Sequence, residues 1–239
     1  MRGIIVAAND AIEWQMAWWY PHLREMNQDP IVIFDLGLSK AGLARAKSIG
    51  TVIQPELPTL AMDYPLKEEW LFSYHGDLDA VRRTWFLKPF VFAQTPFEET
   101  LWLDLDCKVQ GSLEPIYEYS NQPSGLSLAH DSDESHKKRL EFGMRYPDEV
   151  IYNSGVVSYR KDSILLKSWI EEVKERHDQY FSDQEALSRV IYRSDLEFEP
   201  LPKIYNGRLW HKPQSDLVIV HYATAQMKLR IMQELLVKY

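Results

Sequence analysis

Two short apolar runs near the beginning of the chain constrain its fold most strongly. Residues 4–8 and 31–34 are rich in β-branched side chains, and an Asn or Asp follows each run. The stretch between them carries apolar residues at three- and four-residue spacing, which predicts a helix with one apolar stripe. These residues are Ile12, Met16, Trp19 and Leu23. A strand, a helix and a second strand in this order form the unit from which parallel sheets are built.

Capping and breaking residues set the expected limits of the first helices. Asp10 is placed to cap the first helix, and Pro21 is expected to kink or end it. Ser39 is a good cap for a second helix, which Gly50 stops before a short strand at 51–54. The beginning of the chain therefore alternates strands with helices.

The rest of the chain continues this alternation less regularly. Residues 55–79 are rich in proline, aromatic and acidic residues, show no clean period, and are expected to form an irregular connection. Further helices are expected at 81–92, 164–174, 184–192 and 227–237. Further strands are expected at 99–105, 126–129, 156–159 and 217–221. We therefore predict an α/β protein with a mostly parallel central sheet flanked by helices.

Composition limits the class of protein and its partners. The 239 residues are 45% hydrophobic and 26% charged, as expected for one globular domain over residues 1–239. Lys and Arg total 27 and Asp and Glu total 35, and this net charge of −8 argues against nucleic acid as a partner. The single Cys107 favours a reducing compartment, so we expect a cytoplasmic protein. The apolar run at 4–8 is too short for a signal peptide or a membrane span.

The strand expected at 99–105 leads into two carboxylates, Asp104 and Asp106. Open α/β sheets bind ligands at the carboxyl ends of their strands. Residues one apart on a strand point to opposite sides, but a turn beginning at Asp104 can bring both carboxylates to one cation. Such oxygen ligands suit Mg²⁺ or Mn²⁺ shared with phosphate oxygens. Taken alone, an acid pair of this kind is more often two exposed residues in a turn.

The segments around this acid pair resemble a known family. The run at 85–115 looks like the core of GT-A-fold glycosyltransferases, particularly family eight, which includes glycogenin and bacterial lipooligosaccharide galactosyltransferases. Other segments resemble motifs of that family in the same order. They are D-L-G-L-S at 35–39, Y-N-S-G-V at 152–156, S-D-Q-E-A-L at 182–187, L-P-K-I-Y-N at 201–206, and V-H-Y at 220–222 with Lys228. The resemblance, which touches the chain from residue 4 to residue 228, implies the GT-A fold and a hexosyltransferase.

The resemblance also implies a site for a metal ion and a nucleotide sugar. Asp104 and Asp106 would hold Mn²⁺ or Mg²⁺ at the donor diphosphate, with His221 as the third ligand. Three residues are implied near the transferred sugar as catalytic residues, namely Asp183, Gln184 and Asn153. Further donor contacts are implied for Ala7, Asn9, Asp10, Lys88, Asp131 and Lys228.

Several of these residues also have an ordinary structural interpretation. His221 can be a buried histidine that closes a strand, and Asp183 can cap the helix that follows it. Lys88 can be a plain helix residue. The last motif departs from the family, because it lacks a glycine near Thr224 and because Lys228 is displaced by one residue. This departure leaves the phosphate contact of Lys228 open.

The implied activity is metal-dependent transfer of a hexose from a nucleoside diphosphate sugar, UDP-sugar by analogy, to a glycan or glycolipid. The resemblance at residues 183–184 favours retention of the anomeric configuration. One alternative is a haloacid-dehalogenase-type phosphohydrolase with Asp104 as nucleophile. Another is a catalytically silent binding or scaffold protein. The amphipathic tail at 227–239 can either lie on an anionic membrane surface or pack on the domain.

Overall fold

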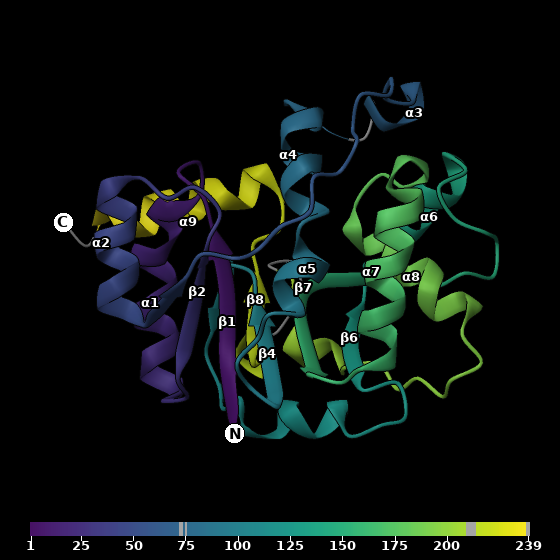
Figure 1. Cartoon of the computed structure of the whole chain (residues 1–239). Coiled ribbons are helices and arrows are strands. Elements are labelled where there is room, and N and C mark those ends of the chain that lie inside the picture. Colours follow the sequence, from purple (N-terminus) through teal and green to yellow (C-terminus); the bar gives the residue numbers. More distant parts are fainter. Residues whose placement is uncertain (72–73, 75, 209–213, 238–239) are drawn as a thin grey trace.

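A six-stranded sheet forms the centre of the computed structural model, which describes residues 1–71, 74, 76–208 and 214–237. Its strand order is β3-β2-β1-β4-β7-β6 (Figure 1). The bounds are β1 (Arg2–Ala8), β2 (Ile31–Asp35), β3 (Thr51–Ile53), β4 (Glu99–Leu103), β6 (Leu126–His130) and β7 (Tyr152–Arg160). Strands β1 to β4 pair in parallel, whereas β7 runs antiparallel to both of its neighbours. The predicted α/β architecture with a mostly parallel sheet is therefore confirmed.

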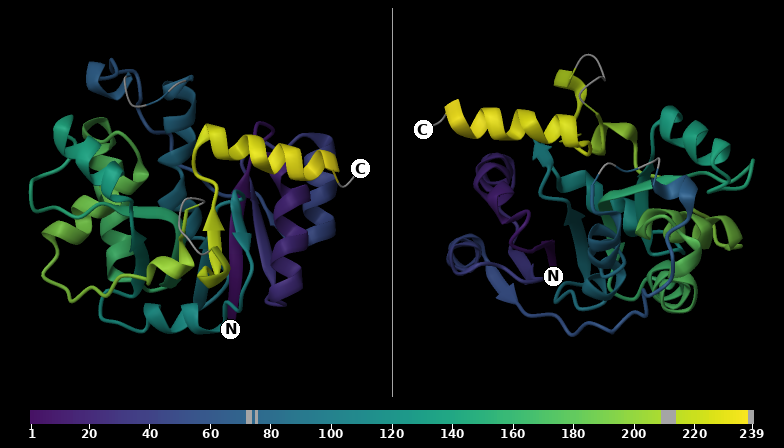
Figure 2. Two further views of the ribbon diagram at one scale, coloured as in Figure 1. Left: turned by 180° about the vertical axis from the view of Figure 1, so that it is seen from behind. Right: turned by 90° about the horizontal axis from the view of Figure 1, so that it is seen from above.

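Helices cover both faces of this sheet, because successive side chains of its strands point to opposite sides. Along β1, Ile4 and Val6 join one buried cluster, and Ile5 joins the other. The first face is covered by α1 (Met16–Met26), α2 (Lys40–Ile49) and α9 (Ala225–Val237). The second face is covered by α5 (Lys88–Phe92), α7 (Ile164–Arg176) and α8 (Asp183–Arg193). Both views of Figure 2 show α9 lying beside α1, which it contacts.

A second, two-stranded sheet joins the middle of the chain to its last strand. β5 (Cys107–Val109) pairs antiparallel with β8 (Ile219–His221), and Cys107 lies opposite His221. The sequence did not predict β5, because three residues are too few to show a period. Short 3₁₀ helices occur at η1 (Glu13–Gln15), η2 (Glu114–Ser120), η3 (His177–Gln179), η4 (Lys203–Tyr205) and η5 (Gln214–Asp216).

Two expected helix limits were wrong, and one of the two effects expected of Pro21 is not seen. The first helix begins at Met16 after the η1 turn, so Asp10 does not cap it. Pro21 lies inside α1 and does not end it, because burial of Trp19 and Leu23 outweighs the one hydrogen bond that proline removes. The helix expected at 81–92 is two helices, α4 (Leu78–Trp85) and α5. Pro89 lies in the first turn of α5, where its missing N–H is tolerated.

Two segments that were assigned no element contain helices. The connection at 55–79 includes α3 (Glu68–Leu71) and the start of α4, which Asp77 caps by accepting a hydrogen bond from the Ala80 N–H. The charged stretch after β6 forms α6 (Asp133–Glu141). The predicted tail is α9, and residues 238–239 lie outside the described residues. No helix in the described ranges is long and apolar enough to cross a membrane.

Candidate active site

The candidate site lies where the strand order of the main sheet reverses. From β1 the chain continues to β2 and β3 on one side, and β4 then lies on the other side of β1. Ligands of open α/β sheets bind at the carboxyl ends of the strands at such a point. The β1–β4 register pairs Ile5 with Trp102, so continuing it by two residues sets Ala7 level with Asp104.

Three later segments bring polar residues to this same edge of the sheet. The antiparallel strand β7 begins here, and the Asp104 N–H donates to the Gly155 carbonyl at 2.8 Å. Strand β6 runs opposite to β7, so it ends here with Asp131 just after it. Helix α8 begins with Asp183 and Gln184, both of which are buried.

The carboxylates of the acid pair both approach the imidazole of His221. His221 Nε2 lies 3.2 Å from Asp106 Oδ1 and 3.9 Å from Asp104 Oδ2. Ligands at about 2.1 Å from an octahedral ion stand about 3.0 Å apart when adjacent and about 4.2 Å apart when opposite. Asp106 Oδ1 is also buried without a hydrogen-bond partner. Both distances from His221 fit two ligands of one Mn²⁺ or Mg²⁺ ion, although Asp104 is not in the group whose ligand atoms all lie within 4.8 Å of one another.

Cys107 lies near these ligands but is a poor donor. Its sulfur, an Asp106 oxygen and a His221 nitrogen all lie within 4.8 Å of one another. Burial, with the nearby charges of Asp106 and Asp104, raises the pKa of the Cys107 thiol well above its ordinary value. The side chain also belongs to the apolar core between the sheet and α1. We therefore assign it a packing role.

Lys228 faces the second carboxylate of the acid pair. Its Nζ lies 3.2 Å from Asp106 Oδ2, in the first turns of α9. Burial of Asp106 would raise the pKa of its carboxyl, but His221 and Lys228 outweigh burial and hold this pKa well below its ordinary value. The displaced lysine of the last motif therefore lies beside the acid pair, and its contact with a phosphate stays a prediction.

Lys88 is the cation at the first carboxylate. Its Nζ lies 3.3 Å from Asp104 Oδ1, 3.7 Å from Asp183 Oδ2 and 3.2 Å from Ser154 Oγ. Burial alone would lower the pKa of Lys88, but the charges of Asp104 and Asp183 outweigh it and raise this pKa. Trp102 Nε1 donates to the same Asp104 oxygen at 2.7 Å, which fixes the carboxylate.

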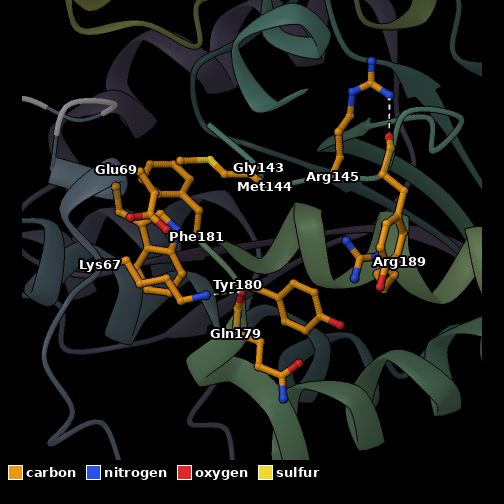
Figure 3. A pocket seen from close by; sticks show the side chains of 11 residues that line it. Lys67, Glu69, Gly143, Met144, Arg145, Gln179, Tyr180, Phe181 and Arg189 are labelled. Carbon is orange, nitrogen blue, oxygen red and sulfur yellow. Dashed lines mark hydrogen bonds between the residues drawn. The ribbon is translucent and has the colours of Figure 1, made fainter. Parts of the chain in front are cut away.

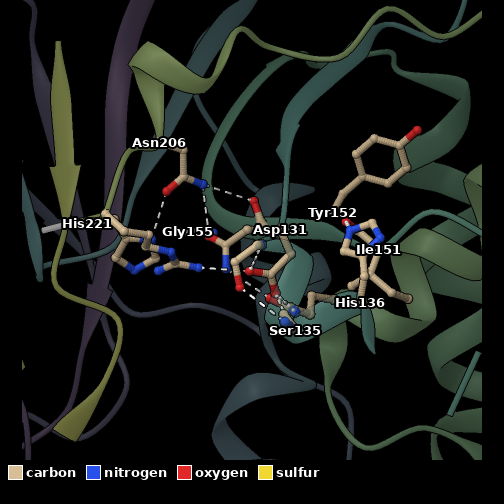
Figure 4. A network of polar contacts seen from close by, with 12 residues as sticks. Asp131, Ser135, His136, Ile151, Tyr152, Gly155, Asn206 and His221 are labelled. Carbon is tan, nitrogen blue, oxygen red and sulfur yellow. Dashed lines mark hydrogen bonds and ion pairs between the residues drawn. The ribbon is translucent and has the colours of Figure 1, made fainter. Parts of the chain in front are cut away.

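Buried amide groups continue the network away from the acid pair. Asn153 Nδ2 donates to Gln184 Oε1 at 3.2 Å, and Gln184 Nε2 donates to Asp131 Oδ2 at 2.9 Å. Arg208 contacts Asp131 Oδ1 at 3.0 Å. Figure 4 shows the Asp131 carboxylate with Ser135 beside it. Burial would raise the pKa of Asp131, but Arg139, Arg208 and hydrogen bonds from Ser135 and Gln184 lower it to about 2.

The structure brings most of the sequence-predicted site residues into one connected group. Its members are Lys88, Asp104, Asp106, Asp131, Asn153, Asp183, Gln184, His221 and Lys228. Ala7 and Asn9 lie at the same edge of the sheet, and Asn9 Oδ1 is buried without a hydrogen bond. Asp10 is exposed and lines a separate groove of about 490 Å³ with Trp14 and Arg45.

Sequence reasoning missed several members of this network, among them Trp102, Ser154, Asn206 and Arg208. Trp102 and Ser154 stood inside recognised segments but had no role assigned to them. Asn206 ends the L-P-K-I-Y-N segment, and that resemblance was the one signal that pointed to it. Arg208 had no signal, because a single arginine after a glycine carries no periodicity or spacing.

A cavity of about 230 Å³ lies beside the start of α8 (Figure 3). Lys67 and Trp70 of the connection before α4 line one side of it. Phe181, two residues before Asp183, lines another side, and the exposed Tyr146 lies at the turn after α6. The volume is smaller than the roughly 300 Å³ at which drug-sized pockets begin.

Solved structures share this fold, although no known family profile and no curated protein matches the sequence. A crystal structure of the galactosyltransferase LgtC with donor and acceptor sugar analogs is 15% identical, with a TM-score of 0.63 over 94% of this chain and 88% of that chain. The glycosyltransferase GlyE of Streptococcus pneumoniae TIGR4 is 17% identical, with a TM-score of 0.60 over 94% and 55%. Mouse xyloside xylosyltransferase 1 is 13% identical, with a TM-score of 0.58 over 95% and 98%. The expected GT-A fold is confirmed.

Proposed function

We propose that residues 1–239 act as one metal-dependent glycosyltransferase domain. It moves a hexose from a nucleoside diphosphate sugar, with UDP as the nucleotide, to a hydroxyl of a glycan or glycolipid. The observation that carries the proposal is the approach of His221 Nε2 to Asp106 Oδ1 and to Asp104 Oδ2 at the sheet edge where the strand order reverses. The fold, shared with LgtC and GlyE, is consistent with this use.

The residues around His221 and the acid pair fit the parts of a diphosphate donor. Asp104, Asp106 and His221 would hold Mn²⁺ or Mg²⁺, which supplies positive charge to the departing diphosphate. Lys88 and Lys228 add two cations beside the same carboxylates. Ala7 and Asn9 end β1 next to them, where the base and ribose would lie, and the buried Asn9 oxygen is free to accept a hydrogen bond.

The proposed sugar subsite consists of Asp183, Gln184 and Asn153. Asp183 is buried, and burial raises the pKa of its carboxyl. Asp183 would accept hydrogen bonds from sugar hydroxyls, while Gln184 and Asn153 would flank the anomeric carbon and the acceptor. The resemblance of residues 183–184 to the family segment favours retention of the anomeric configuration. We therefore propose retention. An NMR time course in which the product has the opposite anomeric configuration to the donor would show that this is wrong.

The acceptor is proposed to approach from the side of the 230 Å³ cavity. Aromatic rings from Trp70, Phe181 and Tyr146 surround this cavity, and Lys67 and Gln179 add polar groups. Rings with a few polar groups suit a sugar, which presents both C–H faces and hydroxyls. Peripheral membrane contact through α9 would suit a glycolipid, because the exposed apolar residues of α9 share the helix with an exposed cation. These residues are Leu229, Met232, Leu236, Val237 and Arg230.

Thermal unfolding tests donor and metal together. Mn²⁺, UDP, both ligands, and the same series with GDP are added to the full chain. A ligand at one hundred times its dissociation constant stabilises by about 2.7 kcal/mol. For a domain of this size that is a shift of about 5–10 °C in the midpoint. We expect the largest shift of the midpoint with Mn²⁺ and UDP together. We expect no such shift in Asp106→Asn.

Asp162→Asn is the matched control, because the Asp162 side chain is 79% exposed and lies after β7. Transfer is then measured with radiolabelled UDP-hexoses and oligosaccharide or glycolipid acceptors. A scaffold protein that merely keeps the fold would show no joint shift with metal and nucleotide, and no transfer. Equal shifts in Asp106→Asn and in the unaltered chain would contradict the proposed metal site.

A further inference from the structure

A line of buried hydrogen bonds connects the proposed sugar subsite to the proposed metal ligand His221. Gln184 Nε2 contacts Asp131 Oδ2 at 2.9 Å, and Asn153 Nδ2 contacts Gln184 Oε1 at 3.2 Å. Asn206 Nδ2 contacts Asn153 Oδ1 at 2.9 Å, and His221 Nδ1 lies 2.9 Å from Asn206 Oδ1. Figure 4 shows the two ends of this line, Asp131 and His221, with Asn206 beside the imidazole. All five side chains are buried.

The ionised Asp131 sets the direction of every hydrogen bond in the line. With a pKa of about 2, its carboxylate accepts hydrogen bonds and donates none at neutral pH. The nitrogen of the Gln184 amide must therefore face it, which turns the Gln184 oxygen toward the Asn153 nitrogen. The Asn153 oxygen then accepts from Asn206 and also from the Gly155 N–H at 3.1 Å. The orientation of each amide group follows from the one before it.

At the end of the line, the imidazole of His221 has one allowed tautomer in its neutral form. The Asn206 oxygen faces Nδ1, so Nδ1 carries the hydrogen and donates it. Nε2 then presents its lone pair to Asp106 Oδ1 at 3.2 Å. Two lone pairs at this distance repel unless a cation lies between them, either a proton or a metal ion. The line therefore prepares Nε2 for a cation.

Gly155 leaves the space in which this imidazole lies. A Cβ atom added at Gly155 would stand 2.1 Å from His221 Cε1. The ring therefore packs directly against the β7 backbone and cannot rotate toward it. Packing fixes the position of the ring, and Asn206 fixes which of its two nitrogens is free.

We propose that Asn206 is a positioning residue for the metal, acting through the tautomer of His221. It also ties the metal ligand to Asn153 and Gln184, which flank the proposed sugar subsite. This inference rests on the proposed function, because it takes His221 as a metal ligand. Removing the partner of a metal-binding histidine typically lowers metal affinity by about 10–100-fold, and we expect that loss here.

Two substitutions separate the two hydrogen bonds of Asn206. Asn206→Leu keeps the approximate volume but removes both bonds. Asn206→Asp keeps an oxygen that accepts from His221 Nδ1 but cannot donate to Asn153. Mn²⁺ binding without nucleotide is measured by EPR on the full chain, with Asn121→Leu, at an exposed loop position, as the control. We expect Asn206→Leu to bind Mn²⁺ about 10–100-fold more weakly. Asn206→Asp should stay within about threefold of the unaltered chain.

The tautomer is measured separately, so that failure of this inference differs from failure of the proposed function. NMR couplings of ¹⁵N-labelled histidine rings at pH 8, with His221 assigned through His221→Gln, report which nitrogen carries the hydrogen without any metal. We expect it on Nδ1. A neutral ring with its hydrogen on Nε2 alone would overturn the inference, even if Asn206→Leu failed to fold. Unchanged Mn²⁺ affinity in Asn206→Leu would also overturn it, as would an equal loss of Mn²⁺ affinity in Asn206→Leu and Asn206→Asp.

If the unaltered chain binds Mn²⁺, the proposed function stands, whichever nitrogen of His221 carries the hydrogen and whatever the effect of Asn206→Leu. Conversely, an unaltered chain that binds no divalent ion but carries the hydrogen on Nδ1 would refute the proposed metal site and, with it, the role assigned to Asn206 toward a metal. In that case the tautomer of His221 would follow from the buried hydrogen bonds and would have no role in metal binding.

Discussion

Replacing Lys228 by Met should have opposite effects on the two ligands of the proposed site. The amine lies 3.2 Å from Asp106 Oδ2, so it neutralises a carboxylate that would otherwise hold the metal. A metal ion that binds without nucleotide must displace or tolerate this cation. A nucleoside diphosphate, by contrast, brings new negative charge that the same amine can contact. Lys228 should therefore oppose metal binding alone and favour nucleotide binding.

The geometry gives the size of each effect. Two unit charges 3.2 Å apart attract by about 5 kcal/mol at an effective dielectric constant of about 20. The Lys228 side chain is 37% exposed, however, and exposed pairs retain only about 0.2–1 kcal/mol after solvent screening and ordering. Taking about 1 kcal/mol, Lys228→Met should bind Mn²⁺ alone about fivefold more tightly. Loss of a charged hydrogen bond, worth about 1.5–3 kcal/mol, should weaken UDP binding at saturating Mn²⁺ by at least about tenfold.

EPR titration of Mn²⁺ and calorimetric titration of UDP measure the two effects on the same samples. Arg230→Met is the matched control, because it removes the same charge from an exposed position of α9. Weaker Mn²⁺ binding in Lys228→Met would refute the idea that the amine competes with the metal. Equal changes in Arg230→Met would show that the overall charge of α9, rather than the contact with Asp106, is responsible.

Three further predictions concern residues inside the site. Gly155→Ala should displace the imidazole of His221 and abolish the joint stabilisation by Mn²⁺ and UDP. Gly111→Ala should keep this stabilisation, because its added Cβ meets nothing closer than 3.4 Å. The thermal midpoints of both variants with both ligands test this. The pKa of Asp131 is lowered to about 2, so its contribution of about 2–3 kcal/mol is present above pH 4 and is lost as pH falls from about 4 to about 2. The free energy of unfolding, measured with urea between pH 5 and pH 2, should therefore fall less steeply with decreasing pH in Asp131→Asn than in the unaltered chain. Cys107 is buried and the pKa of its thiol is raised, so a disulfide reagent at pH 8 should modify it only after unfolding; rapid modification of the native chain would contradict the packing assigned to it.

The sequence predicted those parts of the fold that depend on local pattern. The β-branched runs of β1 and β2 and the apolar run before Asp104 are long enough to show their period, and each forms a strand. Pro89 was expected inside a continuous helix, but the structure divides that segment at residues 86–87. The periodicity of buried residues is similar on either side of such a break, so pattern alone could not locate it.

Other parts of the site depend on tertiary pairing and could not be read locally. The antiparallel direction of β7 follows from its pairing with β4, and the sequence of β7 itself does not indicate this direction. The partner of β8 is a three-residue strand that begins at Cys107, too short to predict. Asn206 acts through contacts with Asn153 and His221, which are far from it in the sequence. Its role became visible only once the hydrogen bonds were known.

The two-stranded sheet has a consequence for how the protein matures. The six-stranded sheet is complete with residues of β7, whereas His221 reaches Asp106 only when β8 has paired with β5. The residues of β8 follow those of β7 in the chain, so they leave the ribosome after every strand of the main sheet. A nascent chain can thus finish its main sheet and still lack His221, one of the proposed metal ligands. Metal binding at the proposed site would then be a late step of biogenesis, and a substitution that slows the docking of β8 would leave a folded protein without the complete site.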